Sequence, residues 1–231
     1  MTYAIQPPNI AAVPVAHTDL LFPVRRIYCI GRNYVEHAKE MGYTGREAPF
    51  FFMKPADAIL PVADGETGRM PYPGKTVNLH HEIELVVAIG KRGANIAATD
   101  APSYIWGYAV GLDMTRRDLQ KDAKDKGRPW EVGKAFDHSA PIGPLHPVTK
   151  TGLLVSGEIR LDVNGAKRQA SDLDKLIWNV AETIEHLSGL FELQPGDLIF
   201  TGTPEGVAKV GKGDVMEGSI AKLGALRVEV V

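Results

Sequence analysis

Short apolar runs, separated by turns rich in glycine and proline, make up most of the chain and predict a strand-rich fold. The strongest run is 82–90 (EIELVVAIG), and further strands are expected at 24–31, 50–54, 59–62, 75–80 and 105–113. Side chains alternate between the two faces of a strand, and both faces of 82–90 are largely apolar, which is typical of a strand buried on both sides. The 24 glycines and 16 prolines agree with a chain that turns often.

Three segments have the character of helices: 33–41, a charged stretch at 116–126, and 172–190. The last of these has apolar residues at helical spacing. Ser171 or Asp172 is expected to cap its start, and Gly189 to end it.

The second half of the chain also contains a clear hairpin signal. Asn164-Gly165 lies between 158–163 and 166–170, and it is the pair that a type I′ turn needs. Residues 127–147 are expected to form a loop, because glycine and proline recur through them.

Composition and charge narrow the class of protein. No repeat or linker interrupts the chain, so we expect one domain over 24–231, preceded by an extended arm or small cap at 1–23. The formal net charge of −2 lacks the positive footprint of a nucleic-acid binder. The single cysteine, Cys29, excludes an internal disulfide framework and a cysteine-based zinc site. Because there is no basic leader and no run near the roughly 20 apolar residues of a membrane span, a cytoplasmic protein without a membrane partner is expected.

Three carboxylates stand at the tips of apolar runs. Glu82 and Glu84 point to the same side of their strand, about 7 Å apart along the backbone, and Asp113 ends the run 105–113. Like charges in a buried place need a compensating cation, and oxygen ligands suit Mg²⁺ or Mn²⁺, with Ca²⁺ possible. Two simpler interpretations stay open at this point: the glutamates lie at an exposed strand start, and Asp113 caps the following helix.

Other candidate groups are weaker when taken alone. His37 and Glu40 are three residues apart, so on a helix they share a face and the carboxylate can orient the imidazole as a general base. Such pairs are also common on inert helix surfaces. Lys134 lies in the 127–147 loop and could equally be a surface lysine. The turn Thr201–Pro204 offers hydroxyls and amides to an anion.

Seven blocks in the chain resemble the fumarylacetoacetate hydrolase family, and in particular its short acylpyruvate-hydrolase members. They are GRNYVEHAKEM (31–41), FMKP (52–55), NLHHEIEL (78–85), GLDMTRRDLQ (111–120), GRPWEVGKAFD (127–137), VNG (163–165) and PGDLIFTGTPEGV (195–207). The resemblance implies a β-rich α+β fold, a mixed β-roll or sandwich with a few short helices and a lid helix, and a homodimer. Residues 24–231 would then be one catalytic domain of this type.

The resemblance also implies a role for each matching residue. Glu82, Glu84 and Asp113 would bind a divalent metal, and His37 with Glu40 would form a dyad on the lid helix. Lys134 matches the lysine of the PW block. Arg117, Gln120 and Thr203 fall where the family holds the 2-oxo acid end of its substrate.

The activity implied is metal-dependent hydrolysis of the C–C bond of an acylpyruvate through a metal-bound pyruvate enolate. Fumarylpyruvate, split to fumarate and pyruvate in aromatic compound catabolism, is the expected substrate. The alternatives are an oxaloacetate decarboxylase, which needs no attacking water, and a hydratase or decarboxylase of a catechol meta-cleavage pathway. A non-catalytic β protein with a structural ion is the contrasting class. Ala56-Asp57 departs from the family pattern, and this departure bears on substrate choice.

Overall fold

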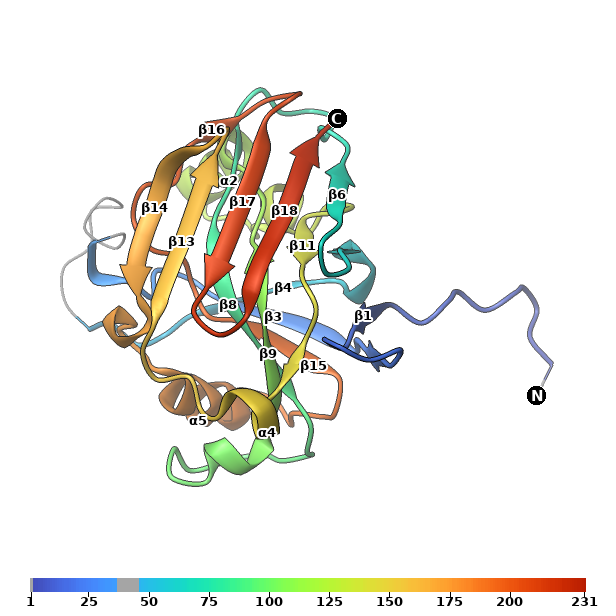
Figure 1. The fold of residues 1–231 in the computed structure, drawn as a ribbon, viewed down its shortest axis with the longest axis vertical. Helices are drawn as coiled ribbons and strands as arrows, with labels where there is room; N and C mark the ends of the chain where they lie inside the picture. The colour runs from blue at the N-terminus through green and yellow to red at the C-terminus, as the bar shows by residue number, and fades with distance from the viewer. Residues whose placement is uncertain (1, 37–45) are drawn as a thin grey trace.

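The computed structural model describes residues 2–36 and 46–231, in which two β-sheets pack face to face (Figure 1). In spatial order, the larger mixed sheet contains β4 (Phe51–Lys54), β3 (Arg26–Ile30), β15 (Asp197–Phe200), β8 (Ile83–Ile89), β9 (Ile105–Leu112), β11 (Ala140–Ile142) and β5 (Ile59–Pro61), with β12 (His146–Pro147) paired to β9. The smaller sheet contains β14 (Ala166–Asp172), β13 (Glu158–Val163), β17 (Val215–Ile220), β18 (Gly224–Val230) and β6 (Thr67–Met70). This arrangement confirms the β-rich fold expected from the sequence.

Shorter elements close the ends of the sheets. A small sheet is formed by β10 (Thr115–Arg116), β7 (Leu79–His80) and β16 (Lys209–Val210). The described helices are α2 (Arg117–Asp125), α3 (Glu131–Lys134), α4 (Val148–Thr151) and α5 (Val180–Leu190), with 3₁₀ turns η1 (Ala56–Ala58), η2 (Ala101–Tyr104) and η3 (Leu173–Lys175). None of the helices within the described residues is long and apolar enough to cross a membrane. The expected lid helix, with His37 and Glu40, lies mostly outside the described residues.

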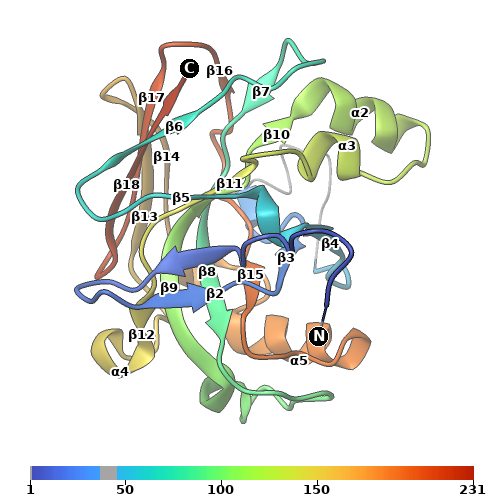
Figure 2. The ribbon, with the colours of Figure 1, turned by 90° about the vertical axis from the view of Figure 1, so that its right-hand side faces the viewer.

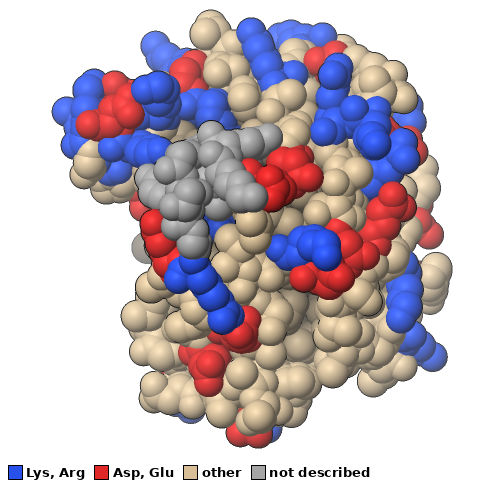
Figure 3. All heavy atoms as spheres, turned by 90° about the vertical axis from the view of Figure 1, so that its left-hand side faces the viewer, with Lys and Arg blue, Asp and Glu red and all other residues tan. Residues whose placement is uncertain are grey.

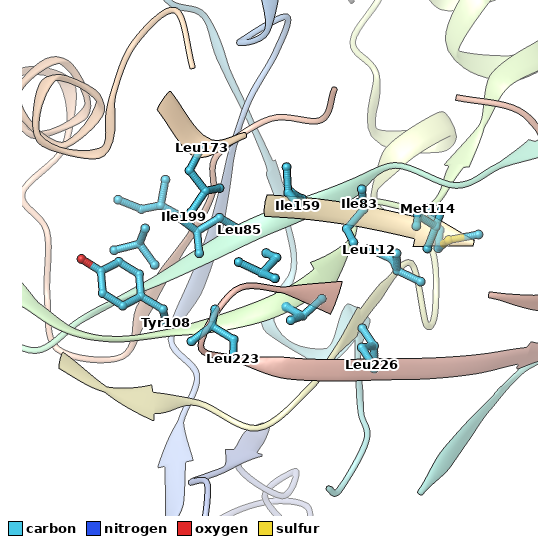
Figure 4. Close-up of a cluster of buried hydrophobic side chains, with 14 of the residues drawn as sticks. Ile83, Leu85, Tyr108, Leu112, Met114, Ile159, Leu173, Ile199, Leu223 and Leu226 are labelled. Atoms are coloured by element: carbon cyan, nitrogen blue, oxygen red, sulfur yellow. The ribbon is translucent and has the colours of Figure 1, made fainter. Parts of the chain in front are cut away.

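Strand β8 runs through the centre of the core. Every one of its residues is buried, as predicted for a strand covered on both sides. One face, with Ile83 and Leu85, packs against Ile159 and Leu226 of the smaller sheet (Figure 4). The opposite face, with Val86, belongs to a second apolar cluster. The two-sided burial explains why this strand reads as an almost continuous apolar run.

The second cluster is covered by the hairpin of β1 (Ala12–Pro14) and β2 (Leu21–Pro23), which is seen in Figure 2. Val13 and Phe22 are buried there, and the Phe22 ring lies 4.8 Å from that of Trp106. By contrast, residues 2–10 are exposed and extend away from the sheets (Figure 1). The region 1–23 therefore contains a segment that packs on the core and a segment that projects from it.

Three sequence predictions about secondary structure are wrong. The strand expected at 75–80 is limited to β7, which covers Leu79–His80. The helix expected over 172–190 begins only at Val180, and Asn179 caps it by accepting a hydrogen bond from the Glu182 N–H at 3.0 Å. The residues before it do not form an α-helix, because β14 runs to Asp172, only the short 3₁₀ turn η3 follows, and the Ile177 N–H donates to the Asn33 carbonyl at 2.8 Å.

The stretch 127–147 is not a plain loop. It contains α3, β11 and β12, and β11 pairs with both β5 and β9 inside the larger sheet. The hairpin prediction, in contrast, is confirmed, because Asn164 and Gly165 turn the chain between β13 and β14 with φ of 52° and 76°.

Candidate metal centre

Three carboxylates meet where β8 begins and β9 ends. The two strands are antiparallel, with Ile83 opposite Leu112, and the Asp113 N–H donates to the Glu82 carbonyl oxygen at 2.8 Å. Glu82, Glu84 and Asp113 each offer an oxygen, and these oxygens lie within 4.8 Å of one another. The side chains are buried, with residue exposures of 5%, 2% and 1%. This donor set, oxygen alone and converging, is the kind that hard divalent cations prefer.

The burial removes the simpler interpretations of these residues. Glu82 and Glu84 are not at an exposed strand start. Asp113 does not cap the helix that follows, because α2 begins after Arg116 and has no side-chain cap. Neither exposure at a strand start nor helix capping therefore accounts for the three carboxylates.

Buried cations surround the carboxylates. Lys134 Nζ, at the end of α3, lies 2.6 Å from both Glu82 Oε2 and Asp113 Oδ2. Lys54 Nζ, at the end of β4, lies 2.9 Å from Asp113 Oδ1, and Arg117 pairs with Glu82. Both lysines are 2% exposed or less. The negative charge of the cluster is therefore offset by the chain's own residues, as burial of charges requires.

Protonation differs between the members of the cluster. Burial, and then the neighbouring carboxylates of Asp113 and Glu82, raise the pKa of Glu84 well above its ordinary value, although the Gly202 N–H donates to Glu84 Oε2 at 2.8 Å. For Lys134, burial alone would lower the pKa, but Asp113 and Glu82 outweigh it and the pKa is raised. Lys134 is thus held as an ammonium, whereas burial and the neighbouring carboxylates favour the protonated form of Glu84.

The predicted substrate-side residues lie around the same hollow. We call it the carboxylate hollow, and the predicted site residues that line it are Glu82, Glu84, Asp113, Arg117, Gln120, Lys134 and Thr203. Arg117 donates to Gln120 Oε1 along one face of α2. Helix α3 approaches α2 closely at Gly133, where an added Cβ atom would lie 2.8 Å from the backbone nitrogen of Gln120. This close approach brings Lys134, the next residue, to the carboxylates. His37 and Glu40, the remaining predicted site residues, lie outside the described residues.

Two buried polar residues of the site were not anticipated. Lys54 also donates to the carbonyl oxygens of Met114 (3.3 Å) and Ser139 (3.0 Å), so it ties β4 to the segments that carry Asp113 and Lys134. The signal that could have found it is a single lysine inside the apolar stretch FFMKP.

The second is Gln169, which is 1% exposed. Its Oε1 accepts from the Ile83 N–H at 3.1 Å and lies 3.0 Å from His81 Nδ1. Its Nε2 donates to Thr203 Oγ1 at 2.9 Å. Gln169 therefore joins the hairpin to the start of β8 and to the Thr201–Pro204 turn, and nothing in its sequence position marks it.

One face of the molecule carries both signs of charge. On the face seen in Figure 3, Lys and Arg side chains of the described residues are interspersed with Asp and Glu. The site is thus distinguished by its buried charges, not by a single-sign surface field.

Comparison with known proteins defines the class to which this fold and site belong. The family model described as fumarylacetoacetate (FAA) hydrolase C-terminal matches residues 26–231. The chain belongs to the fumarylacetoacetate hydrolase family.

Individual relatives are more specific. The chain is 46% identical over 185 residues to a fumarylpyruvate hydrolase of a Ralstonia species, covering 80% of this chain and 93% of the relative. It is 40% identical over 199 residues to the mitochondrial oxaloacetate decarboxylase of Dictyostelium discoideum, covering 86% and 90%. A crystal structure of fumarylpyruvate hydrolase from Pseudomonas aeruginosa in complex with Mn²⁺ and pyruvate is 56% identical, with a TM-score of 0.98 over 100% of this chain and 99% of that one.

Proposed function

We propose that the chain is a metal-dependent hydrolase of acylpyruvates and that it splits fumarylpyruvate into fumarate and pyruvate. One observation carries the proposal: three buried carboxylates and Lys134 meet in one hollow. The proposal is supported by the identity of 56%, over the full length, to a fumarylpyruvate hydrolase that binds Mn²⁺ and pyruvate. Because fumarylpyruvate arises when aromatic rings are broken down, the enzyme would act in the catabolism of aromatic compounds.

Glu82, Glu84 and Asp113 are the residues that would hold the cation. Three carboxylate oxygens within 4.8 Å of one another fit Mg²⁺ or Mn²⁺, and Ca²⁺ has the same ligand preference. When bound, such a cation would take the oxygens of the 2-oxo acid end of the substrate and stabilise the negative charge of the departing enolate. Burial and the neighbouring carboxylates of Asp113 and Glu82 raise the pKa of Glu84, and a bound cation would favour its ionised form.

The other residues of the hollow would bind and orient the same end of the substrate. Lys134 is buried and held as an ammonium, so it would offset charge that develops beside Glu82 and Asp113. Arg117 and Gln120 share one face of α2 and would hold the substrate carboxylate together with Thr203, which lines the same hollow. This placement would keep the reacting carbons in one position.

Water activation is proposed for His37, oriented by Glu40, on the basis of their spacing and the family resemblance. His37 would take a proton from water, and the hydroxide would attack the acyl carbonyl carbon. The bond between that carbon and the neighbouring methylene carbon then breaks, and the methylene carbon receives a proton. The products are the acid and pyruvate, so that one water is consumed for each bond broken.

Pyruvate release from fumarylpyruvate tests the proposal directly. We expect turnover with Mn²⁺ or Mg²⁺, its loss after EDTA treatment, and its return when the metal is restored. Glu84→Gln should abolish turnover, whereas Glu158→Gln, a matched change at an exposed position of β13, should not. A wild-type protein that binds Mn²⁺ but releases no pyruvate from fumarylpyruvate would contradict the proposal, and dienoate substrates would be tested next.

Oxaloacetate decarboxylation is the second candidate, because the Dictyostelium relative is an oxaloacetate decarboxylase. Decarboxylation could use the same hollow but needs no attacking water. His37→Ala should therefore abolish fumarylpyruvate hydrolysis and leave at least part of any decarboxylase activity. Equal loss of both activities would contradict this division of roles.

We also propose that the enzyme is a cytoplasmic homodimer. The buried, unpaired Cys29 agrees with a reducing compartment. The arm at 2–10 is exposed and includes Tyr3 (66%), Ile5 (81%) and Ile10 (77%), and residues 1–18 contain no Lys, Arg, Asp or Glu. Such a segment suits an interface between two copies. Light scattering on the full chain and on a chain without residues 2–10 would test this, and a monomeric full chain would contradict it.

A further inference from the structure

Gln169 brings a buried amide from the smaller sheet to the turn that borders the carboxylate hollow. It lies on β14, the edge strand of that sheet, and is 1% exposed. The register of β14 against β13 shifts by one residue at this point, so that Arg168 is an extra residue, a β-bulge. Lys167 and Arg168 are both exposed, whereas Gln169 is buried. A bulge that redirects a side chain in this way is frequent beside functional sites.

The bulge packs against the segment that contains Thr203. A Cβ at Gly206, where φ is 90°, would lie 2.1 Å from the Arg168 carbonyl oxygen, so only glycine fits there. One turn residue earlier in space, the Pro204 carbonyl oxygen accepts a hydrogen bond from Gln169 Nε2 at 2.7 Å. Strand β14 therefore holds the Thr201–Pro204 turn by its backbone and by the side chain of Gln169.

Two backbone partners of fixed polarity determine which way the Gln169 amide points. The Ile83 N–H can only donate, and it lies 3.1 Å from Oε1. The Pro204 carbonyl can only accept, and it lies 2.7 Å from Nε2. An inverted amide would place a donor against a donor and an acceptor against an acceptor, so the backbone permits one orientation alone.

The remaining positions of the amide are also occupied. Oε1 lies 3.0 Å from His81 Nδ1, so that this nitrogen carries the hydrogen and donates it. The second hydrogen of Nε2 is donated to Thr203 Oγ1 at 2.9 Å. An amide has two hydrogens to donate and two lone pairs to accept with, and all four are engaged. Gln169 consequently has no position left to accept a hydrogen bond from the Thr203 hydroxyl.

The Thr203 hydroxyl must therefore give its own hydrogen to another group. Among residues 2–36 and 46–231, Gln169 is the hydrogen-bond partner of this hydroxyl. Thr203 lines the carboxylate hollow. Thr201, in the same turn, differs, because its Oγ1 donates to the Leu85 carbonyl oxygen at 2.9 Å and is committed to the fold. The hydrogen of Thr203 is thus the one that the turn offers to an acceptor in the hollow.

We propose that Gln169 is a positioning residue, which fixes the Thr203 hydroxyl as a hydrogen-bond donor to the anionic end of the substrate. This inference rests on the proposed function, in which Thr203 holds the 2-oxo acid end. A hydroxyl can donate or accept, and one that presents its lone pairs to a carboxylate repels it. Gln169 acts through Thr203, without contact with the substrate, and selects the polarity that an anion requires.

A double-mutant cycle on the Mn²⁺-loaded full chain tests the assignment. The four proteins are the wild type, Gln169→Glu, Thr203→Val and the double variant. Pyruvate is the probe, because it consists of the 2-oxo acid end alone, and equilibrium dialysis with labelled pyruvate gives its Kd. Gln169→Glu keeps the size of the side chain but turns the donor that faces Thr203 into an acceptor, so the hydroxyl should donate to the new carboxylate instead of the ligand.

Thr203→Val should weaken pyruvate binding about 10- to 100-fold, as for loss of a hydrogen bond to a charged group. Gln169→Glu should weaken it at least about 10-fold, because it redirects the hydroxyl and adds a negative charge. In the Thr203→Val background the same change should show the charge effect alone, so the cycle should give a coupling of about 10-fold.

A matched control and two further measurements accompany the cycle. Gln194→Glu makes the same chemical change at a half-buried residue before β15, whereas Thr203 follows that strand, and its pyruvate affinity should stay within about threefold of wild type. Melting temperature and Mn²⁺ affinity of each variant separate a defect in pyruvate binding from a defect in folding or metal binding.

Three results would overturn the assignment. The first is an effect of Gln169→Glu that is equal in the two backgrounds, which would mean that Gln169 supports the fold without setting the polarity of Thr203. The second is a Thr203→Val protein that binds pyruvate as tightly as the wild type, and this is decisive even if Gln169→Glu does not fold. The third is a Mn²⁺-loaded wild type that does not bind pyruvate. A wild type that binds pyruvate but releases none from fumarylpyruvate would instead overturn the proposed hydrolase function, and a coupling of the expected size would still support the role of Gln169.

Discussion

Lys54 Nζ lies 2.9 Å from Asp113 Oδ1, and both side chains are buried between β4 and the end of β9. Lysine is rarely buried to this extent unless it is paired. Here the same ammonium also donates to three backbone carbonyl oxygens, those of Met114, Lys134 and Ser139. Lys54 is thus a structural link between the edge of the larger sheet and the metal centre.

Lys54→Met should destabilise the protein strongly. The change leaves Asp113 without one of its two buried cations and frees three carbonyl oxygens, so we expect a loss of about 3–5 kcal/mol in the free energy of unfolding. Urea denaturation measures this. Lys167→Met, at an exposed position of β14, should change stability by no more than about 0.5 kcal/mol. A Lys54→Met protein as stable as this control would contradict the proposed link.

Glu84→Gln should separate metal binding from folding. In the metal-free protein, Glu84 faces the like charges of Asp113 and Glu82, so its neutralisation should leave the melting temperature unchanged or raise it. The same variant should lose the rise in melting temperature that Mn²⁺ gives the wild type, because one of three ligands is weakened. Differential scanning calorimetry with and without Mn²⁺ checks both parts. A large destabilisation of the metal-free variant would instead indicate a structural role for the ionised carboxylate.

The Lys134→Met variant should still bind the metal ion but lose turnover of fumarylpyruvate. Removal of the ammonium leaves Glu82 and Asp113 more available to a metal, so Mn²⁺ affinity should be equal or higher. The kcat on fumarylpyruvate should fall by about 10²- to 10³-fold, the size expected when a positioned charge stabiliser is removed. Calorimetric titration with Mn²⁺ and steady-state kinetics give the two values. Loss of Mn²⁺ binding would show that Lys134 serves mainly to assemble the ligands.

The features that could be predicted from sequence are those determined by neighbours along the chain. β8 and β9 are long and apolar on both faces, so the apolar runs in the sequence correspond directly to strands in the structure. Asn164-Gly165 is likewise sufficient to specify its own turn. The carboxylates were found because each interrupts such an apolar run at its end.

What could not be predicted depends on contacts between distant segments. The helix α5 begins after its cap, Asn179, because the backbone of Ile177 is hydrogen-bonded to Asn33. The spacing of apolar residues along the sequence does not reveal that contact. β11 becomes a strand through pairing with β5 and β9, although Pro141 lies within it and Gly143 follows it. Gln169 gains its place only because the hairpin folds over the start of β8.

A last prediction concerns the dependence of stability on pH and tests the hairpin that carries Gln169. Asp172, at the end of β14, accepts hydrogen bonds from the Asp174 and Gly157 N–H groups, each at 2.9 Å, and these lower its pKa from the ordinary 3.8. A carboxyl whose pKa is lower in the folded than in the unfolded state stabilises the fold above its unfolded pKa, and this contribution is lost as the pH falls through the folded pKa. Asp172→Asn, which cannot ionise, should therefore be less stable than wild type at pH 7 by about 1 kcal/mol. The difference should shrink as the pH is lowered below the ordinary pKa, and urea denaturation over that range measures it. A difference that stays constant with pH would mean that the charge of Asp172 contributes nothing to the fold.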